Sequence, residues 1–427
     1  MIVIAGAGLT GLCIARQLKG SAYTVYERED RPGGLCRSVE LDGFTFDYTG
    51  HLLHLRDPSV RRMVRRITPG GLDSIVRRAA VYCMGKYLPY PFQANTCGLP
   101  PEVVYECVMG FIEAAAQKKA PGRSSGHFRQ WVTATFGKGI ARHFFIPYNE
   151  KLWQADLSSL TSEWADWSIP RPTVEEVVRG ALGIKNEAMG YNATFLYPRR
   201  CGIETLARAL AGGLKNMHTG AEISAVNLAQ KRITLQDGTR TGYDRLVSTL
   251  PLPRLLAMIE DLPPAYAAAA AKLRYVSVQN LNIAVNRERV SDFHWVYFPE
   301  PEFPFYRVGF YSNISPSLAP PKTSSLYIEI SACPNRKKSP EAVRDASLEG
   351  LRRCGILKRG DRIIVSKHLD IDCAYVVFDT FRRKTLAGLM RYLSRRGVLS
   401  TGRYGAWTYS SMEDALRQGR QAGVMLR

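Results

Sequence analysis

A glycine-rich turn near the start of the chain is the first place where residue type and spacing specify a chemistry. The turn reads Gly6-Ala7-Gly8-Leu9-Thr10-Gly11. It follows an apolar strand expected at 2–5 and opens a helix expected at 9–18. Bare backbone can approach a pyrophosphate there, and the N-terminus of the helix faces its negative charge. The turn therefore predicts a dinucleotide site that includes Leu9 and Thr10.

Glu27 strengthens this prediction because it ends a second expected strand, at 23–26, about 20 residues after the glycines. A carboxylate in that position can accept hydrogen bonds from both hydroxyls of an adenosine ribose, and it would repel a 2′-phosphate. The residue therefore favours FAD or NAD over NADP. A tight turn that binds no ligand is the alternative interpretation of the glycines alone.

The segment after Glu27 distinguishes FAD from NAD. It reads Glu27-Arg28-Glu29-Asp30-Arg31-Pro32-Gly33-Gly34-Leu35-Cys36-Arg37. This segment resembles the large FAD family that contains amine oxidases, protoporphyrinogen oxidase and UDP-galactopyranose mutase, in which a Glu-Arg, Gly-Gly and Arg pattern wraps the FAD pyrophosphate. The resemblance implies FAD as cofactor, bound by Arg28, Gly33, Gly34, Leu35 and Arg37. A surface arginine without a ligand is the alternative for Arg37.

The C-terminal segment resembles the flavin-closing motif of the same family. Its residues are Gly402-Arg403 and then Ser410-Ser411-Met412-Glu413-Asp414. Ser410 or Ser411 is expected to cap a helix, which leaves the amide of Met412 free to donate to the pyrimidine edge of the flavin. A capped surface helix is the alternative interpretation.

Within this family the chain is most similar to the mutase-like branch, which acts on sugar nucleotides or glycan precursors. The similarity rests on Gly50-His51-Leu52-Leu53-His54, Phe144-Phe145-Ile146-Pro147-Tyr148-Asn149-Glu150-Lys151-Leu152-Trp153, Ile169-Pro170-Arg171, and Tyr197-Pro198 before Gly202. It implies that Gly50, His51 and Ile223 lie near the flavin. It also implies catalytic roles for His51, Arg171 and Arg307, and substrate contacts for Tyr148, Trp153, Arg171, Tyr191, Arg307 and Tyr375.

The chain departs from the mutase pattern at several positions. Mutases carry Tyr-Thr-x-Lys-Gln-Trp-Gly, whereas Asn149, Leu152 and Gln154 replace the Thr, Gln and Gly. The mutase Arg-Ile-Pro-Val-Arg becomes Ser168-Ile169-Pro170-Arg171-Pro172, so one arginine is missing and the other is displaced. Core packing is the alternative for Tyr148 and Trp153, and a structural role is the alternative for His51 and His54. The identity of the substrate therefore stays open.

The elements that must position these residues predict an α/β fold. We expect a Rossmann-like FAD-binding domain of the glutathione-reductase type, interrupted by a helical insertion and by an antiparallel-sheet substrate domain. The expected boundaries are 1–57, 195–255 and 390–427 for the FAD-binding domain, 58–194 for the insertion and 256–389 for the substrate domain. Strands expected at 276–285, 294–298, 306–311, 325–330 and 362–366 alternate in polarity, which favours a sheet with one covered face.

Composition and charge limit the classes of molecule that the chain is expected to bind. The 427 residues contain 58 Lys and Arg against 38 Asp and Glu, a formal net charge of +20 that favours anionic partners. Nucleic acid ranks last because the arginines are dispersed, whereas peripheral contact with acidic lipid stays open. No apolar run is long enough to predict a membrane span. Nine cysteines without paired spacing predict reduced thiols, a cytoplasmic protein and no metal site.

Three functions stay open. In the first, oxidised FAD accepts a hydride at its N5 atom from a substrate C–H bond, and the chain is an oxidoreductase. In the second, reduced FAD acts as a nucleophile on an anomeric carbon, and the reaction is a redox-neutral isomerisation. A sugar or sugar nucleotide is the expected small-molecule substrate in both. The third is a non-catalytic, flavin-bound adaptor at a membrane surface.

Overall fold

A five-stranded parallel sheet holds the glycine-rich turn. The computed structural model describes residues 1–18, 20–117, 126–165, 169–186 and 193–427. The strand order is β19 (Val398–Ser400), β13 (Arg245–Ser248), β1 (Ile2–Ala5), β2 (Tyr23–Tyr26) and β9 (Met217–His218). All four pairings are parallel. The Rossmann-like prediction is therefore confirmed.

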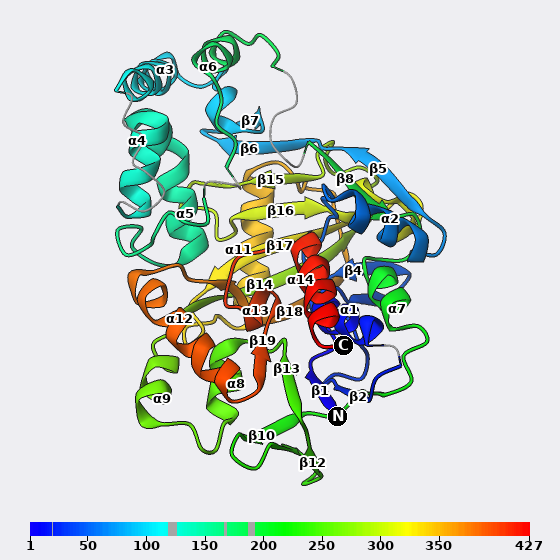
Figure 1. Cartoon of the computed structure of the whole chain (residues 1–427). Coiled ribbons are helices and arrows are strands. Elements are labelled where there is room, and N and C mark those ends of the chain that lie inside the picture. Colours follow the sequence, from blue (N-terminus) through cyan, green and yellow to red (C-terminus); the bar gives the residue numbers. More distant parts are fainter. Residues whose placement is uncertain (19, 118–125, 166–168, 187–192) are drawn as a thin grey trace.

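The first and last helices of the chain pack side by side next to this sheet, blue and red in Figure 1. They are α1 (Leu9–Gln17) and α14 (Met412–Met425). Two glycines of α14 make the close approach possible. A Cβ on Gly419 would lie 2.6 Å from the Cβ of Cys13, and a Cβ on Gly423 would lie 2.4 Å from that of Gln17. The packing brings both ends of the polypeptide to one site.

A seven-stranded sheet forms the second layer. Its order is β18 (Ile363–Val376), β14 (Tyr275–Val285), β17 (Ser324–Ala332), β16 (Arg307–Phe310), β15 (Trp295–Tyr297), β6 (Ala79–Cys83) and β7 (Lys86–Pro89). The pairs are antiparallel, as predicted, except that β15 and β6 are parallel.

The prediction of one covered face is wrong for the central strands of this sheet. Strand β17 is buried along its whole length, and only the first residue of β14 is partly exposed. Helix α11 (Pro340–Arg353) covers one face, where Val343 and Leu351 pack with Leu281 and Ile283. Val278 and Tyr327 line a cavity from the same two strands. Both faces are therefore occupied.

The segment 58–194 is helical only in part. Its helices are α2 (Pro58–Ile67), α3 (Pro101–Ala116), α4 (Phe128–Ile140), α5 (Ile146–Trp153) and α6 (Val174–Ala181). The helical expectation is wrong at 72–89, where β5 (Leu72–Val76), β6 and β7 form strands. Gly70 and Gly71 directly precede β5, Gly85 directly precedes β7, and all three adopt positive φ. The domain boundaries given above remain a prediction.

The remaining elements connect these layers. They are β3 (Ser38–Leu41), β4 (Phe44–Asp47), β8 (Thr194–Pro198), α7 (Glu204–Ala211), β10 (Ile223–Asn227), β11 (Arg232–Leu235), β12 (Arg240–Gly242), α8 (Leu252–Met258), α9 (Pro264–Ala270), α10 (Tyr311–Ile314), α12 (Thr380–Arg395) and α13 (Gly402–Gly405). Short 3-10 turns lie at Phe92–Ala94 and Pro316–Leu318, and a π-helical turn at Ala141–Phe145 joins α4 to α5.

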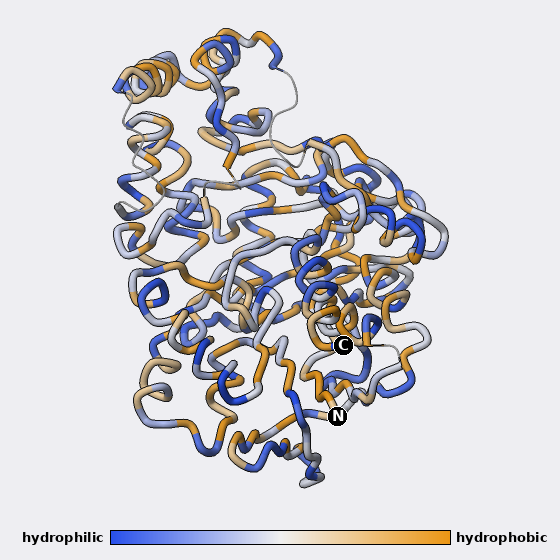
Figure 2. The backbone as a smooth tube through the Cα atoms, in the orientation of Figure 1, coloured by the Kyte–Doolittle hydropathy of each residue, from blue (hydrophilic) through white to orange (hydrophobic). Residues whose placement is uncertain are grey.

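Hydrophobic and hydrophilic residues alternate over much of the backbone, as Figure 2 shows. This pattern is typical of elements that bury one face. Among the helices that the structure describes, none has the length and apolar character needed to cross a membrane.

Candidate active site

A cavity of about 1150 Å³ is lined by residues from both sheets and from α5. It reaches from the glycine-rich turn through Gly50 and His51 to Tyr148 and Arg307. Typical small-molecule sites occupy roughly 300–1000 Å³. The cavity therefore has room for a large ligand such as a dinucleotide.

The glycines form an open backbone cradle at one end of the cavity. Gly8 is the N-cap of α1, and no heavy atom lies within 4 Å of the position that a Cβ on it would take. Gly33 and Gly34 pack against this turn at positive φ, and a Cβ on Gly34 would lie 3.3 Å from the Cα of Gly8. Bare amides at the start of a helix suit a pyrophosphate. The residues present therefore fit the predicted cofactor.

Gly11 has a different role from Gly8. A Cβ on Gly11 would lie 2.0 Å from the carbonyl oxygen of Gly6, so this glycine allows the helix to pack against the turn. Gly11 is absent from the cavity lining, whereas Gly6, Gly8, Leu9 and Thr10 are part of it.

Glu27 lines the cavity beside the turn, as predicted, and is almost fully buried. Its Oε2 accepts a hydrogen bond of 2.8 Å from the amide of Ala7, and its Oε1 accepts one of 3.1 Å from the amide of Glu29. The carboxylate therefore supports the glycine turn and also lines the cavity. Ile223 lines the same region.

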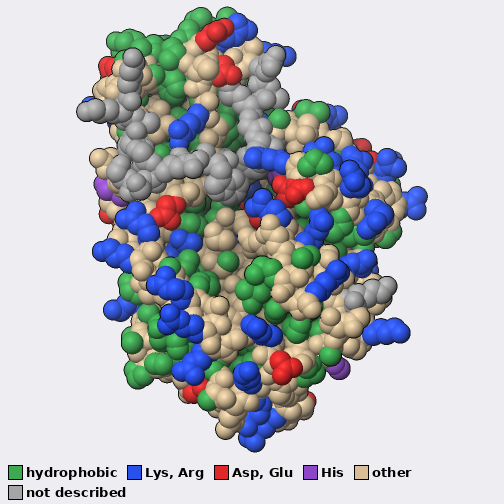
Figure 3. All heavy atoms as spheres, in the orientation of Figure 1, with side chains coloured by type: hydrophobic (Ala, Val, Ile, Leu, Met, Phe, Trp, Pro, Cys, Tyr) green, Lys and Arg blue, Asp and Glu red, His purple; other side chains and the backbone are tan. Residues whose placement is uncertain are grey.

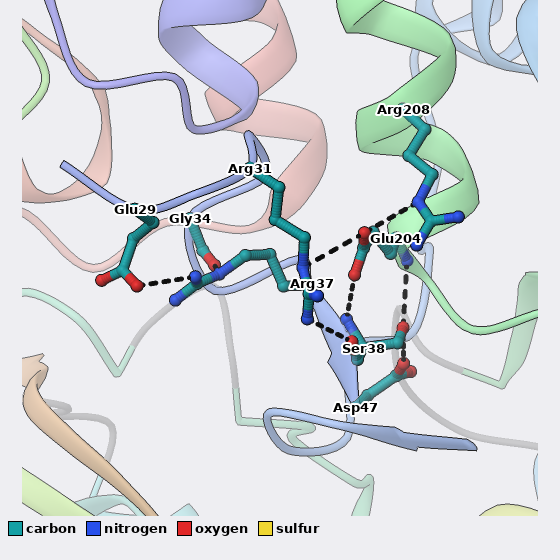
Figure 4. Close-up of polar contacts among 8 residues, drawn as sticks. All are labelled: Glu29, Arg31, Gly34, Arg37, Ser38, Asp47, Glu204 and Arg208. Atoms are coloured by element: carbon teal, nitrogen blue, oxygen red, sulfur yellow. Dashed lines mark hydrogen bonds and ion pairs between the residues drawn. The ribbon is translucent and has the colours of Figure 1, made fainter. Parts of the chain in front are cut away.

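Arg37 is fixed against the Gly-Gly loop (Figure 4). Its Nη1 donates to Glu29 at 2.8 Å, and its Nε donates to the carbonyl oxygen of Gly34 at 2.9 Å. Burial alone would lower the pKa of Arg37, but the pairing with Glu29 raises it overall. Arg28 also donates to Glu29. The charge of Arg37 is therefore shared between this carboxylate and the cavity.

A buried polar network that the sequence analysis missed supports the same loop (Figure 4). Glu204 accepts hydrogen bonds from the Ser38 amide at 2.7 Å and from Arg208 at 2.8 Å. The hydroxyl of Ser38 donates to Asp47 at 2.6 Å. Burial raises the pKa of Asp47 to about 6. No spacing rule connects residues that lie this far apart in the sequence.

The C-terminal motif closes over the glycine turn. Gly402 has a φ of +82°, and a Cβ on it would lie 2.8 Å from the Oγ1 of Thr10. Arg403 donates to the carbonyl oxygens of Ser410 and Ala374. Both Gly402 and Arg403 line the cavity.

Ser411 caps α14, as one of the two predicted alternatives. Its hydroxyl accepts a hydrogen bond of 3.2 Å from the amide of Asp414. Met412 is the first helical residue, and its N–H has no partner in the part of the chain that the structure describes. Ser411 and Met412 both line the cavity, so this amide is available to a ligand.

Gly50 and His51 lie at the middle of the cavity. A Cβ on Gly50 would lie 2.2 Å from the hydroxyl oxygen of Tyr327, so only glycine fits there. Burial, together with the nearby charges of Arg403 and Arg307, lowers the pKa of His51 to about 4. The imidazole is therefore neutral near pH 7 and can serve as a hydrogen-bonding group.

Arg307 forms a two-bond ion pair with Glu329 at the other end of the cavity. Its Nη2 donates to Oε1 at 2.7 Å, and its Nε donates to Oε2. Glu329 has no exposed side-chain surface. Burial would lower the pKa of Arg307, but Glu329 holds it well above its usual range. Glu329 therefore holds the charged guanidinium of Arg307 in a fixed orientation at the cavity wall.

Tyrosine side chains surround this pair. Tyr148 and Tyr375 were predicted, and the hydroxyls of Tyr306 and Tyr375 lie 3.3 Å apart. Burial raises the pKa of Tyr148 and Tyr375 well above the usual value, so their hydroxyls stay neutral. The sequence analysis missed nine further tyrosines of the cavity wall, which are Tyr26, Tyr48, Tyr90, Tyr275, Tyr297, Tyr306, Tyr327, Tyr404 and Tyr409.

Two residues that were predicted to contact the substrate do not line the cavity. Trp153 is 2% exposed and donates to the Oδ1 of Asn149 at 3.2 Å, which matches the core-packing alternative. Arg171 is exposed, and its guanidinium lies 5.4 Å from the ring centroid of Trp131. Neither lines the cavity. Tyr191 lies outside the described residues.

The described cysteine, histidine and carboxylate side chains decide whether the chain holds a disulfide or a metal site there. All nine cysteines are free thiols. Within the described ranges, no group of three His, Cys, Asp or Glu side chains is arranged to hold a metal ion.

Comparisons with known proteins agree with this geometry. A crystal structure of reduced UDP-galactopyranose mutase has a TM-score of 0.92 at 29% identity, covering 100% of this chain and 95% of that chain. Putrescine oxidase bound to putrescine has a TM-score of 0.66 at 16% identity, covering 100% and 98%.

A shorter likeness involves 65 residues, 15% of the chain. They are 38% identical to an uncharacterised protein in the nifH2 3′ region of Methanothermococcus thermolithotrophicus, and they span only 64% of its length. The family model of flavin containing amine oxidoreductases matches residues 9–424. The chain therefore belongs to the family of flavin containing amine oxidoreductases, and FAD is its cofactor.

Proposed function

We propose that the chain is a redox-neutral mutase of the UDP-galactopyranose mutase type, which isomerises a sugar nucleotide with reduced FAD. The observation that carries the proposal is the likeness of the whole chain to a reduced UDP-galactopyranose mutase. Its 29% identity is nearly twice the 16% found with putrescine oxidase, a relative that the name describes as an oxidase.

The polar groups of the cavity support a sugar as the ligand. The hydroxyls of Tyr148 and Tyr375, whose pKa values burial raises, can both donate and accept hydrogen bonds, as a polyol requires. Their rings offer apolar faces to the C–H groups of a sugar ring. His51 adds a neutral imidazole at the middle of the cavity. The wall therefore suits a ligand with many hydroxyls.

The diphosphate of the substrate needs a cation at the same end. Arg307 supplies one, and Glu329 holds its guanidinium in a fixed orientation while leaving Nη1 without a partner among the described residues. Arg403 supplies a second positive charge near His51. Two arginines in one low-dielectric cavity favour a diphosphate.

Reduced FAD, when bound, supplies a nucleophilic ring nitrogen that can attack an anomeric carbon. The chain then has three tasks. The tyrosine wall orients the sugar and limits access of water, Arg307 and Arg403 hold the departing diphosphate close, and the neutral His51 accepts or donates a hydrogen bond to the sugar. The nine free thiols fit a reducing compartment, and we infer a cytoplasmic enzyme.

The test compares turnover of oxidised and dithionite-reduced holoenzyme on a panel of nucleotide sugars, including UDP-galactopyranose. We expect an isomeric product only with reduced enzyme, without added electron acceptor. Turnover that requires oxidised FAD and consumes oxygen would instead support net oxidation, the other enzymatic alternative. A panel without any product, under conditions where FAD is bound, would contradict both.

A further inference from the structure

Helix α2 and strand β5 lie in a strongly basic part of the chain. Residues 55–78 contain seven arginines and two aspartates, and they contain no lysine or glutamate. Lys and Arg side chains gather at the right of Figure 3, where α2 and β5 lie in Figure 1. The buried residues of α2 are Val60 and Val64. Its exposed arginines, which we call the α2 basic face, are Arg61, Arg62, Arg65 and Arg66.

The α2 basic face is a continuous and unpaired positive surface. At 100° per residue, its four arginines span an arc of about 140° around the helix. Arg62, Arg65 and Arg66 form no ion pair and no side-chain hydrogen bond with any residue that the structure describes. Their guanidinium groups are therefore available to an anion outside the chain.

The two aspartates of this segment bind other groups. Asp57 is the N-cap of α2 and accepts hydrogen bonds from the amides of Ser59 at 2.7 Å and Val60 at 3.2 Å. Asp73 accepts a hydrogen bond of 2.8 Å from Arg199. Neither carboxylate pairs with the α2 basic face, so its positive charge is not compensated within the segment.

A small polar depression lies between α2 and β5. Its volume is about 140 Å³, and its lining includes Arg61, Arg65 and Ser74. A water molecule takes up roughly 30 Å³ of the liquid, so the depression has room for a group of several heavy atoms. Arg61 is fixed there because its Nε donates to the carbonyl oxygen of Leu55 at 3.0 Å. Guanidinium and hydroxyl donors around one depression suit a phosphate group.

Helix α2 is attached to the FAD-binding part of the fold. The amide of Asp57 donates to Glu413 at the start of α14, at 2.7 Å. Arg420 of α14 donates to the hydroxyl of Ser59 at 2.9 Å. The apolar side of α2 is buried in the protein, so this helix can meet another surface through its charges and not by insertion.

We propose that the α2 basic face binds the anionic headgroups of a membrane surface. Each Arg or Lys close to an acidic membrane strengthens binding roughly fivefold, so four act together. Val76, at the end of β5, is 66% exposed and offers an apolar side chain beside the charges, as interfacial segments do. The contact adds to the proposed catalytic function and does not depend on it.

The composition of the segment argues against nucleic acid as the partner. Residues 55–78 contain no Phe, Tyr or Trp that could stack on an unpaired base. They also contain no Asn or Gln that could read the edge of a base pair. Arginines without these companions fit a surface of repeated phosphate groups, which a bilayer of acidic lipid presents.

Co-sedimentation of the FAD-bound protein with lipid vesicles tests the proposal. We expect binding to vesicles of phosphatidylcholine and phosphatidylglycerol in equal parts, and none to phosphatidylcholine alone. Salt at about 1 M shortens the Debye length to about 3 Å and should release the protein. The triple variant Arg62→Gln, Arg65→Gln and Arg66→Gln should bind about 100-fold more weakly, because three charges are lost.

The matched control removes three exposed arginines from another basic helix. Arg391→Gln, Arg395→Gln and Arg396→Gln change the end of α12, which lies on the opposite side of Figure 1 from α2. Both triple variants lower the net charge by the same amount. The control should keep its affinity for the anionic vesicles to within about twofold, because its charges lie away from the α2 basic face.

The other outcomes contradict the proposal. A wild type that does not sediment with the anionic vesicles would overturn it, and so would equal binding to both kinds of vesicle. Equal losses in the two triple variants would mean that net charge alone attracts the lipid. Binding to a DNA duplex and not to the vesicles would assign the face to nucleic acid. Flavin absorbance and the melting temperature check that both variants are folded, since only exposed side chains are changed.

Discussion

The two ends of the cavity are built in different ways. The dinucleotide end consists of backbone amides and glycines, which close turns around Gly8, Gly34 and Gly402. The substrate end consists of large side chains, Arg307 and the tyrosines, which come from separate strands and from α5. A site made of backbone depends on a few glycine positions, and almost any substitution at these positions should abolish binding. A site made of side chains distributes its binding energy over many residues.

The largest expected effect comes from Gly8→Val. The space around the missing Cβ is open, so the protein should fold, but the new side chain would occupy the place of the pyrophosphate. We expect FAD content to fall at least tenfold, measured from the visible flavin absorbance of the purified protein. Gly388→Ala on α12, which also meets no atom within 4 Å, is the control and should keep its FAD.

Glu329→Ala tests the other end of the cavity. It leaves Arg307 half-buried without its carboxylate, and breaking such a pair costs about 3–5 kcal/mol. Chemical denaturation should show this loss of stability. The same deletion in the exposed pair of Arg289 and Asp292 should cost about 0–1 kcal/mol. Equal costs for the two pairs would contradict the structural role given to Glu329.

Tyr375→Phe removes one hydroxyl from the tyrosine wall. We expect KM for the sugar substrate to rise about tenfold, the loss of roughly one hydrogen bond, while FAD content stays unchanged. Tyr105→Phe, on the distant surface of α3, should leave KM as it is. If Tyr375→Phe lowered FAD content and substrate affinity equally, the two ends of the cavity would not bind their ligands independently.

The smallest effect is expected for Ser411→Ala, which removes the N-cap of α14. The helix should lose about 1 kcal/mol, and FAD affinity should fall a few-fold because the amide of Met412 is held less firmly. Ser339→Ala removes the N-cap of α11, away from the cavity lining. It should lower stability similarly without changing FAD affinity, and an equal change in affinity would refute the role of the cap.

This contrast explains what could be predicted from the sequence. The glycine cradle of the dinucleotide end could be predicted from the sequence, because its residues are close together in the chain. They are Gly6, Gly8, Glu27 and the Gly33-Gly34 pair, and spacing fixes the geometry of such a βαβ unit. Tyr297 and Tyr327 were missed because nothing in their local sequence distinguishes them from core tyrosines. Only the pairing of β15, β16 and β17 brings them together.

Two expectations from the sequence differ from the structure for the same reason. Trp153 has the residue type of a substrate contact, but its indole is buried against Trp164. Strand β6 reads as a short apolar run, which periodicity cannot distinguish from a helical segment. In the fold, its pairing with β15 decides the conformation. Tertiary contacts therefore determine both outcomes.

The most direct test of the account is the spectrum of the oxidised holoenzyme mixed anaerobically with a nucleotide sugar that the reduced enzyme isomerises. We expect the flavin bands to shift slightly on binding and to keep their intensity over many turnover times. Bleaching of the flavin by that sugar would mean that the substrate gives up a hydride, and it would contradict a redox-neutral reaction in this cavity.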